Sequence, residues 1–512
     1  MRNAKLGFCG VLSLVAVAVA EAAPIDIGSR LEVFWDDYLV DTNLTTATRL
    51  VHQPEYVGEI MKFDRPWEGD GFNYHVIVPD RDAQGDFFRM YYNSSSFGLA
   101  APEECEFPAT EIRICYAESR DGTRWTKPEL GLVEFQGSKK NNIIIDACGF
   151  GFDWDNFMVF KDPNPDCPPA ELYKGVAGHL EKDSDFGLWC FLSADGLHWR
   201  KGWLLTKQGE FDSFNVVFWD PVRKEYHCYF RSHHQLEKPD RHGNVHARDV
   251  RHMVSKDFHA WSAPKKISFD TDVEDYALYT SQVQPYPRTP HIYVGFPTRY
   301  VMRGEWTDTF DRLPGLANRR FRSAKEARLG QALTDCVFMM TRDGDVFHRE
   351  EDAFIDPGPE QPKNWLYGDA FPIYGQLVLP GRRPGSDPEL NFHWTEGMWS
   401  GKAQRMLRYA LRMDGFVSRH APDSGAKLVT KPFVFAGGKL TLNFRTSAYG
   451  HLFVTLREAE GGKSIRSHEI FGNKIDRVIG FKDGQVGDFA GKPIVMEFDM
   501  RDADVYAFQF GD

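Results

Sequence analysis

Residues 119–125 read Ser-Arg-Asp-Gly-Thr-Arg-Trp, and related segments recur along the chain. Residues 193–199 read Ser-Ala-Asp-Gly-Leu-His-Trp, residues 255–261 have Phe in place of the glycine, and residues 341–347 end in Phe in place of Trp. A degenerate fifth copy, Met-Asp-Gly-Phe, occupies residues 413–416. Five copies spaced by about 70 residues indicate five similar units, and this period exceeds that of solenoid repeats, which favours the blades of a β-propeller.

The chemistry of the segment explains why it recurs. Asp-Gly forms a tight turn between two strands, and the aromatic residue that follows can pack back onto the sheet. A catalytic site needs one of each group, whereas a turn is needed once in every blade. We therefore expect Asp121, Asp195, Asp257 and Asp343 to be structural and to fasten the outer strands of their blades.

Strand-length runs rich in β-branched and aromatic residues fill most of the remaining chain, and almost no segment has helical periodicity. The predicted fold class is all-β, with a five-bladed β-propeller at residues 63–421. It is followed by a small C-terminal β-sandwich at residues 422–512, where strand-like runs lack the Asp-Gly turn. An additional blade is the alternative for this last segment. Residues 24–62 are expected to be lead-in strands that close the ring or pack on its edge.

The N-terminus has the features of an export signal. Arg2 precedes a largely apolar run at residues 11–20, and small residues follow. This pattern predicts a cleavable signal peptide at residues 1–23. A membrane anchor is the alternative, but the run is too short to cross a bilayer. We expect a secreted or periplasmic protein without membrane insertion.

The charge and cysteine content limit the classes of partner. A net charge of −12 at pH 7 gives no electrostatic footprint for nucleic acid, so no nucleic-acid partner is expected. Of the 8 cysteines, Cys9 lies in the predicted signal peptide, which leaves an odd number and at least one that is free or paired between chains. Cys105, Cys148 and Cys167 lie in loops where a disulfide can form, and no cysteines have metal-site spacing.

The starts of the innermost strands are the predicted location of the site, because these strands line the central channel of a propeller. Carboxylates, amides and aromatic residues cluster there, as sugar chemistry requires: two carboxylates for acid and base or nucleophile, amides for hydroxyl groups, and aromatic faces for sugar rings. The predicted catalytic residues are Asp70, Asp155 and Asp212. The predicted substrate-binding residues are Trp67, Asn73, Asn156, Asn215, Gln282, Asp369 and Glu396.

Other groups compete for these roles. Glu68, Glu210 and Asp335 are further acids near strand starts. The histidine-rich loop of the third blade, around His233 and His234, is interpreted as solvated or substrate-contacting, with a metal site as the alternative. No metal site and no cofactor are predicted, and a structural calcium in the central channel is the alternative.

The chain resembles the five-bladed propeller glycoside hydrolases, the group of β-fructosidases, arabinanases and β-xylosidases. It is more similar to a bacterial family of secreted, glycosyl-hydrolase-like proteins. The segments that carry this likeness include Arg-Ile-Cys-Tyr-Ala-Glu-Ser-Arg-Asp-Gly at 113–122, Lys-Pro-Glu-Leu-Gly at 127–131, Gly-Ser-Lys-Lys-Asn-Asn-Ile at 137–143, Phe-Trp-Asp-Pro at 218–221 and Gly-Phe-Pro-Thr-Arg at 295–299. By position, the resemblance implies Asp70 as base or nucleophile, Asp155 as the residue that orients substrate, and Asp212 or Glu210 as proton donor.

These observations predict a secreted glycosidase whose carboxylates cleave a glycosidic bond of an oligo- or polysaccharide in the central funnel. The long charged insertion at residues 299–329 is expected to close part of that funnel. A non-catalytic carbohydrate-binding propeller is the alternative. A sialidase-like enzyme is a further alternative, but it would require six blades and an arginine triad.

Overall fold

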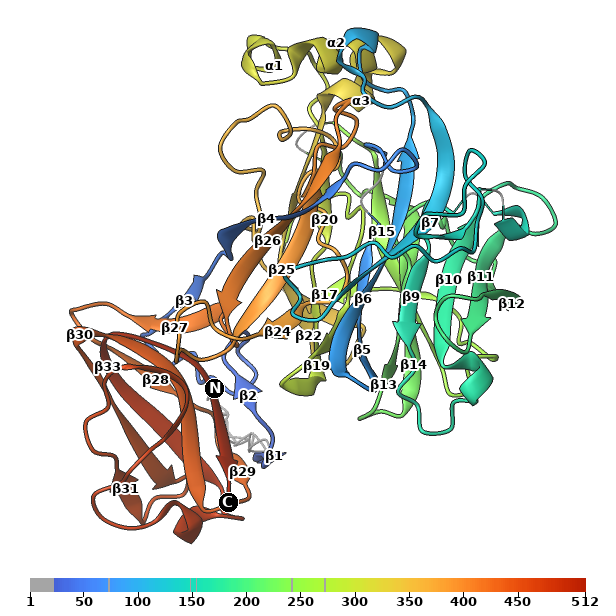
Figure 1. The fold of residues 1–512 in the computed structure, drawn as a ribbon. Helices are drawn as coiled ribbons and strands as arrows, with labels where there is room; N and C mark the ends of the chain where they lie inside the picture. Colours follow the sequence, from blue (N-terminus) through green and yellow to red (C-terminus); the bar gives the residue numbers. More distant parts are fainter. Residues whose placement is uncertain (1–22, 72–73, 148, 153, 241–242, 271–272) are drawn as a thin grey trace, which may run out of the picture.

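The computed structural model describes residues 23–512 apart from 72–73, 148, 153, 241–242 and 271–272. The predicted signal peptide therefore lies outside the described residues except for Ala23. Figure 1 shows a larger body of sheets with helices at one end, and a smaller strand-rich unit beside it that holds the C-terminus. None of the helices in the described ranges is long and apolar enough to cross a membrane.

Five separate sheets follow one another along the chain, and four of them have four strands each. The first comprises β5 (Val76–Asp82), β6 (Gly85–Ser96), β7 (Thr110–Ser119) and β8 (Ile143–Ile145). The second comprises β9 (Met158–Lys161), β10 (Tyr173–His179), β11 (Gly187–Ser193) and β12 (Arg200–Thr206). The third comprises β13 (Val216–Asp220), β14 (Glu225–Gln235), β15 (His246–Ser255) and β16 (Lys265–Lys266).

The fourth sheet comprises β18 (Gln284–Tyr286), β19 (Thr289–Gly295), β22 (Met339–Thr341) and β23 (Val346–Arg349), with β17 (Ser268–Phe269) parallel to β23. The fifth comprises β24 (Leu377–Leu379), β25 (Glu389–Glu396), β26 (Gln404–Arg412) and β4 (Glu55–Phe63). Short 3-10 turns lie at Pro102–Glu104, Gly149–Gly151, Pro169–Glu171 and Val486–Phe489.

The innermost strands of neighbouring sheets contact one another, so the sheets are blades around an axis. β9 lies against both β5 and β13. Val76 in β5 forms a parallel bridge with Tyr374, just before β24, so the fifth blade meets the first. The ring is closed by β4, which pairs antiparallel with β26 and supplies the outer strand of the fifth blade. The predicted five-bladed propeller is confirmed.

The innermost strands are mostly buried because neighbouring blades cover their faces. All five residues of β13, Val-Val-Phe-Trp-Asp, are buried, whereas β12 at the outer edge of the second blade is mostly half-exposed. This difference follows from the position of a strand in its blade: inner strands pack against neighbouring blades, and outer strands face water.

The repeated Asp-Gly segments form the turn that follows the third strand of each blade. In the first copy, Asp121 Oδ1 accepts hydrogen bonds from the backbone N–H groups of Thr123 and Arg124, both at 2.8 Å. The Ser119 hydroxyl oxygen accepts the N–H of Gly122 at 2.9 Å. The copies at Asp195 and Asp343 have the same bonds. These bonds hold the pKa of Asp121 below its usual range, as expected for a structural carboxylate.

Each of these turns also packs against the blade that precedes it. A Cβ atom added to Gly122 would lie 2.9 Å from the Leu379 side chain of the fifth blade. At Gly196 it would lie 2.4 Å from the Tyr91 hydroxyl of the first blade, and at Gly344 3.2 Å from the Tyr229 hydroxyl of the third. The turn is therefore a contact between blades as well as a connection within one.

The insertion in the fourth blade forms a helical cap. β20 (Thr298–Met302) and β21 (Ala332–Cys336) pair as a hairpin, and α1 (Asp308–Arg312), α2 (Leu316–Lys325) and α3 (Ala327–Gln331) lie at its tip, at the top of Figure 1. Arg319 and Arg322 of α2 are buried.

The smaller unit is a ten-stranded sheet with its own apolar core. Its strands are β1 (Ile25–Gly28), β2 (Glu32–Val33), β3 (Thr48–Val51), β27 (Val417–Ala421), β28 (Ala426–Val429), β29 (Phe433–Phe435), β30 (Lys439–Glu458), β31 (Ser464–Arg466), β32 (Asn473–Val478) and β33 (Ile494–Gly511). Hydrogen bonds connect all ten, so the two-sheet sandwich stays a prediction. The lead-in residues divide between β1 to β3 here and β4 in the propeller.

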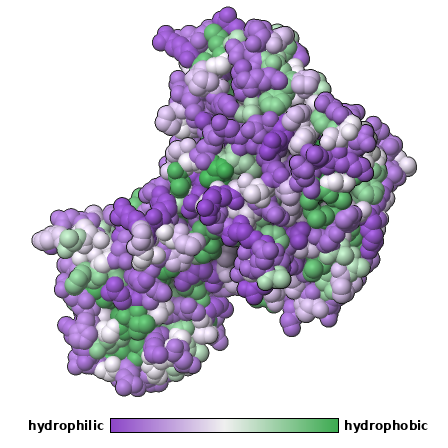
Figure 2. All heavy atoms as spheres, in the orientation of Figure 1, coloured by the Kyte–Doolittle hydropathy of each residue, from purple (hydrophilic) through white to green (hydrophobic). Residues whose placement is uncertain are grey.

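A cluster of aromatic residues joins the two units. Trp35 is fully buried, and its indole N–H donates to the backbone oxygen of Asp414 at 3.0 Å. Asp414 also accepts a hydrogen bond from Tyr286 at 2.7 Å and one from Asn443 at 2.8 Å. The degenerate fifth turn therefore ties the fourth and fifth blades to the smaller unit. On the face shown in Figure 2, hydrophilic side chains predominate and hydrophobic ones form small groups.

The cysteines that the structure describes are Cys105, Cys115, Cys167, Cys190, Cys228 and Cys336, and all six are free. Cys148 lies outside the described residues. Cys115, Cys190, Cys228 and Cys336 are buried, and burial raises the pKa of each thiol.

Candidate active site

A cavity of about 230 Å³ opens on the axis of the propeller, where the innermost strands begin. Each blade contributes at least one residue that precedes its innermost strand, and these include Tyr74, Asp155, Asp212, Tyr279 and Phe371. Arg248 from β15, Arg328 from α3, and Tyr367, Met398 and Trp399 complete the lining. The cavity is thus built from residues far apart in sequence, as expected for a propeller funnel.

Asp155 and Asp212, two of the three predicted catalytic residues, line this cavity together. Asp155 is 8% exposed, and the Asn156 side-chain amide donates a hydrogen bond to its Oδ1. Asp212 is more open, with 60% of its side chain exposed. Its Oδ2 lies 3.1 Å from Nη2 of Arg231, whose side chain is almost fully buried. One carboxyl group is therefore buried and the other is held by a fixed cation.

Aromatic rings form the walls of the cavity. Tyr367 and Trp399 are stacked, with ring centroids 4.8 Å apart and planes within 8°. The Tyr367 hydroxyl donates to the Tyr279 hydroxyl at 2.7 Å. Burial raises the pKa of Tyr367 well above its usual value, so this phenol is neutral at working pH. Flat, neutral aromatic faces beside polar groups are suited to binding a sugar ring.

The helical cap holds one aromatic wall in place. Arg322 Nη1 donates to the backbone oxygen of Trp399 at 2.5 Å, and Arg319 Nη2 donates to that of Trp365 at 2.6 Å. Burial lowers the pKa of both guanidinium groups to about 10, so both remain charged at neutral pH. The insertion at residues 299–329 thus contacts the wall of the cavity, and its closing part of the funnel stays a prediction.

Asp70, the third predicted catalytic residue, lies beneath the cavity wall and does not line the cavity. It is 1% exposed, and Gly401 N–H donates to its Oδ2 at 2.7 Å. Its backbone oxygen accepts the N–H of Trp399 at 2.8 Å. Burial raises the pKa of this carboxyl group. In the structure, Asp70 supports the loop that carries Trp399.

The predicted amide ligands are buried against the backbone. Asn156 Oδ1 accepts the N–H of Gly178 at 2.7 Å, and Asn215 Nδ2 donates to the backbone oxygens of Phe211 and Ser213. Gln282 Nε2 donates to Pro372 O at 3.1 Å. These three residues hold the strand starts in place and are not among the cavity-lining residues. Asn73 lies outside the described residues.

The remaining predicted ligands lie elsewhere. The Trp67 indole donates to Asn142 at 2.8 Å within the first blade. Asp369 is buried beside the cap, and burial raises its pKa well above the usual value. Glu396 forms an ion pair with Arg405 at 2.5 Å and lines a separate cavity of about 570 Å³ on the outer side of the fifth blade.

Sequence reasoning missed several of the cavity residues. Tyr279 and Tyr367 lie in the polar strand starts that predicted the site, so their aromatic character was an available signal. Arg248 lies in a third strand and Arg328 in the helical cap. No pattern in the sequence places either arginine on the axis.

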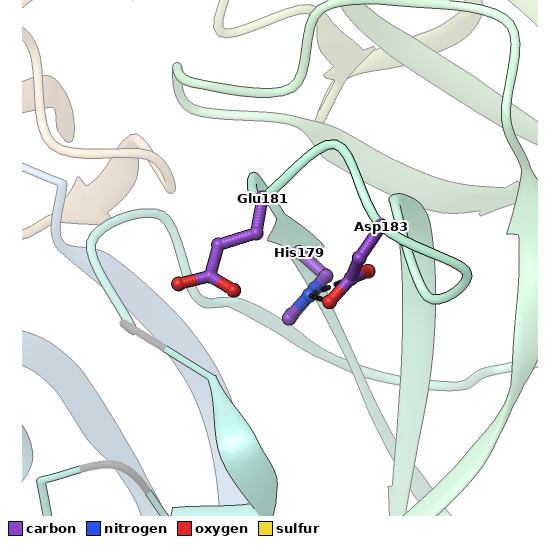
Figure 3. Close-up of side chains that lie close together, drawn as sticks. All are labelled: His179, Glu181 and Asp183. Atoms are coloured by element: carbon purple, nitrogen blue, oxygen red, sulfur yellow. Dashed lines mark hydrogen bonds and ion pairs between the residues drawn. The ribbon is translucent and has the colours of Figure 1, made fainter.

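A group of metal-ligand type lies at the end of β10. The side chains of His179, Glu181 and Asp183 lie near one another (Figure 3). One ligand atom from each lies within 4.8 Å of the others. His179 Nε2 is 3.2 Å from an oxygen of Asp183, and both acids are exposed. The prediction of a loop at His233 and His234 is wrong, because both residues lie in β14, where they continue the pairing with β15. His234 is paired with Asp249 and Asp275, at 3.1 and 2.8 Å.

No protein-family model and no curated protein matches the sequence. Solved structures similar to this chain include a glycoside hydrolase (TM-score 0.40, 11% identity, 70% of this chain and 92% of that one). Another is a glycoside hydrolase family 43 arabinoxylan arabinofuranohydrolase from Bacillus subtilis (TM-score 0.38, 12% identity, 88% and 96%). A third is a GH32 beta-fructofuranosidase from Bombyx mori (TM-score 0.35, 10% identity, 90% and 95%). The blades themselves define the class as five-bladed propellers.

Proposed function

We propose that the protein is a glycoside hydrolase that cleaves a glycosidic bond in the axial cavity. The observation that carries this proposal is the convergence of Asp155 and Asp212 on one aromatic-walled cavity. Two carboxyl groups beside a sugar-binding surface are the machinery that glycoside hydrolysis needs. We also propose export of the protein, because its first residues have the pattern of a signal peptide.

The surroundings of the two acids favour different roles. Asp212 has most of its side chain exposed and lies 3.1 Å from Arg231, so we assign it as the nucleophile or, through a water molecule, as the base at the anomeric carbon. We assign the buried Asp155 as the donor of a proton to the leaving oxygen. The glycosidic carbon–oxygen bond breaks, and water completes the products. This assignment differs from the roles that the sequence resemblance implies.

A non-catalytic carbohydrate-binding propeller is the second candidate, and one observation favours it. The acids whose pKa is raised by burial, Asp70, Asp369 and Glu396, are not among the residues that line the axial cavity. A binding protein needs the aromatic walls but no proton donor.

A panel of plant and algal polysaccharides separates the two candidates. The purified protein is incubated with each polysaccharide, and new reducing ends are measured over time. A hydrolase releases reducing ends from at least one member of the panel. Retention of a glycan on an array without any release during long incubation would support the binding protein and contradict the hydrolase.

A further inference from the structure

The axial cavity contains one arginine whose guanidinium group has no direct partner among the described residues. Arg248 lines the cavity, and none of the described residues forms a hydrogen bond or ion pair with its guanidinium group. Its Nε atom is buried without a partner. Its Cζ lies 5.1 Å from the Tyr279 ring centroid and 4.5 Å from that of Tyr300, and these two rings are stacked on each other, so the guanidinium group packs beside the pair. The two contacts position the side chain, while its buried Nε–H has no acceptor.

The other charged groups around the cavity have partners of their own. Arg231 is paired with Asp212, and Arg328 with Glu326 at 2.5 Å. Asp155, the other acid of the cavity lining, accepts a hydrogen bond from Asn156. Of these three arginines, Arg248 is the one without an ion pair to a described residue, and its buried Nε–H is unfavourable without an acceptor.

The positive charge of these arginines also affects a neighbouring histidine. The half-buried His233 lies close to Arg231 and Arg248, and burial together with these two cations lowers its pKa. Arg328 adds a second guanidinium at the cavity, supplied by the helical cap, with 41% of its side chain exposed. An oxyanion bound in the cavity would accept hydrogen bonds from both Arg248 and Arg328.

We propose that the axial cavity binds an acidic sugar residue, whose carboxylate or sulfate group is held by Arg248 and Arg328 while its ring lies against the Tyr367 and Trp399 wall. The planar guanidinium fork matches an oxyanion in a bidentate geometry. The substrate class would then be uronide-containing or sulfated glycans. The inference rests on the proposed carbohydrate site but does not require hydrolysis.

Matched oligosaccharides test the inference on the full-length protein. A short oligouronide, its methyl-esterified form and a sulfated galactan oligosaccharide are titrated by calorimetry. The ester keeps the size of the sugar and removes its charge. We expect the anionic ligand to bind about 10- to 100-fold more tightly than the neutral one, because a hydrogen bond to a charged group contributes about 1.5–3 kcal/mol. Added salt should weaken the binding of the anionic ligand only. Preference for the oligouronide or for the sulfated ligand identifies the anion.

Variants locate the anion site. Arg248→Gln and Arg328→Gln should each remove most of the difference between the acid and its ester. Arg248→Lys should restore part of it, since lysine keeps the charge but not the fork. Arg251→Gln on the same strand and Arg320→Gln on α2 lie outside the cavity lining and serve as matched controls.

Two results would overturn the inference. One is equal affinity of the wild-type protein for the acid and the ester, which needs no variant to be folded. The other is an equal loss of affinity for the acid and for the ester in the Arg248→Gln variant. Tight binding of the acid without release of reducing ends would contradict the proposed hydrolase while supporting the acidic-sugar site, so the two claims fail separately.

Discussion

Trp399 links the aromatic wall of the cavity, the first blade and the helical cap. Its ring stacks on Tyr367, its backbone N–H donates to Asp70 at 2.8 Å, and its backbone oxygen accepts from Arg322 at 2.5 Å. The ring is therefore positioned by the first blade and by the helical cap at once. Asp70 and Arg322 act on the cavity through this loop.

Replacing Trp399 should weaken glycan binding and also lower the stability of the propeller. For Trp399→Ala, we expect the glycan affinity to fall because the sugar loses an aromatic face, and the free energy of unfolding to fall by about 0.5–1.5 kcal/mol beyond the lost contact area because the stack with Tyr367 is broken. Calorimetry with the best ligand measures this loss, and Trp399→Phe should retain most of the affinity. Unchanged affinity in a folded Trp399→Ala protein would exclude the aromatic wall as the sugar-binding surface.

Position at a strand start was sufficient to find Asp155 and Asp212, but it did not separate cavity residues from buried ones. Asn156 and Asn215 occupy equivalent starts, yet their amides bond to the backbone because successive residues there point to different sides. Arg248 lies near the start of β15, the third strand of its blade, and not at the start of an innermost strand. Which side chains reach the axis depends on how the blades curve, and the sequence pattern does not report that curvature.

The repeated turns act at the level of the blade. Their number and position after the third strand were predicted from the Asp-Gly spacing, since turn chemistry is local. Their contact with the preceding blade was not predicted, because it joins residues distant in sequence, as Gly196 and Tyr91 show. The same glycine thus satisfies a positive φ of 76° and a close approach between blades.

Substitution at Gly196 should reveal the contact between blades. Gly196→Ala combines a strained positive φ with a Cβ atom 2.4 Å from the Tyr91 hydroxyl, so we expect a loss of about 2–4 kcal/mol in the free energy of unfolding. Gly131→Ala is the matched control, with φ of 71° and nothing within 4 Å of the added atom. Its expected loss is about 1–2 kcal/mol. Equal losses in urea unfolding would show that the turn does not hold neighbouring blades together.

In the whole molecule, the N-terminal segment links both units. β4 closes the propeller beside β26, while β1 to β3 join the sheet that contains the C-terminal strands. The sequence indicated lead-in strands but left open whether they close the ring, because strand pairing across more than 300 residues has no local signal. The same long-range pairing makes the smaller unit depend on residues from both ends of the chain.

Buried histidines should make the stability of the molecule depend on pH. Burial lowers the pKa of His75, His227 and His393 to about 3, against about 6.5 in an unfolded chain. The folded state therefore binds fewer protons, so stability is complete above pH 6.5 and falls as the pH decreases toward 3. Each histidine contributes about 1.4 kcal/mol per pH unit in this window.

Urea unfolding between pH 4 and pH 7 measures the slope. His393→Gln should reduce the slope of unfolding free energy against pH by the equivalent of about one bound proton. His468 is exposed, so His468→Gln should leave this slope unchanged. The buried acids Asp70 and Asp369 act in the opposite sense, because their raised pKa values favour protonation on folding, so the comparison between variants isolates the histidine. A slope unaffected by His393→Gln would show that this histidine is not kept neutral by burial.

The central claim is that Asp155 and Asp212 carry out hydrolysis in the axial cavity. The most direct measurement is the turnover rate of Asp155→Asn and Asp212→Asn on the best substrate of the polysaccharide panel, beside Glu210→Gln, an exposed neighbour that pairs with Lys182. We expect each aspartate variant to lose about 10²- to 10⁴-fold in rate with its fold intact, and Glu210→Gln to remain near the wild-type rate. Full turnover in either aspartate variant would contradict the assignment.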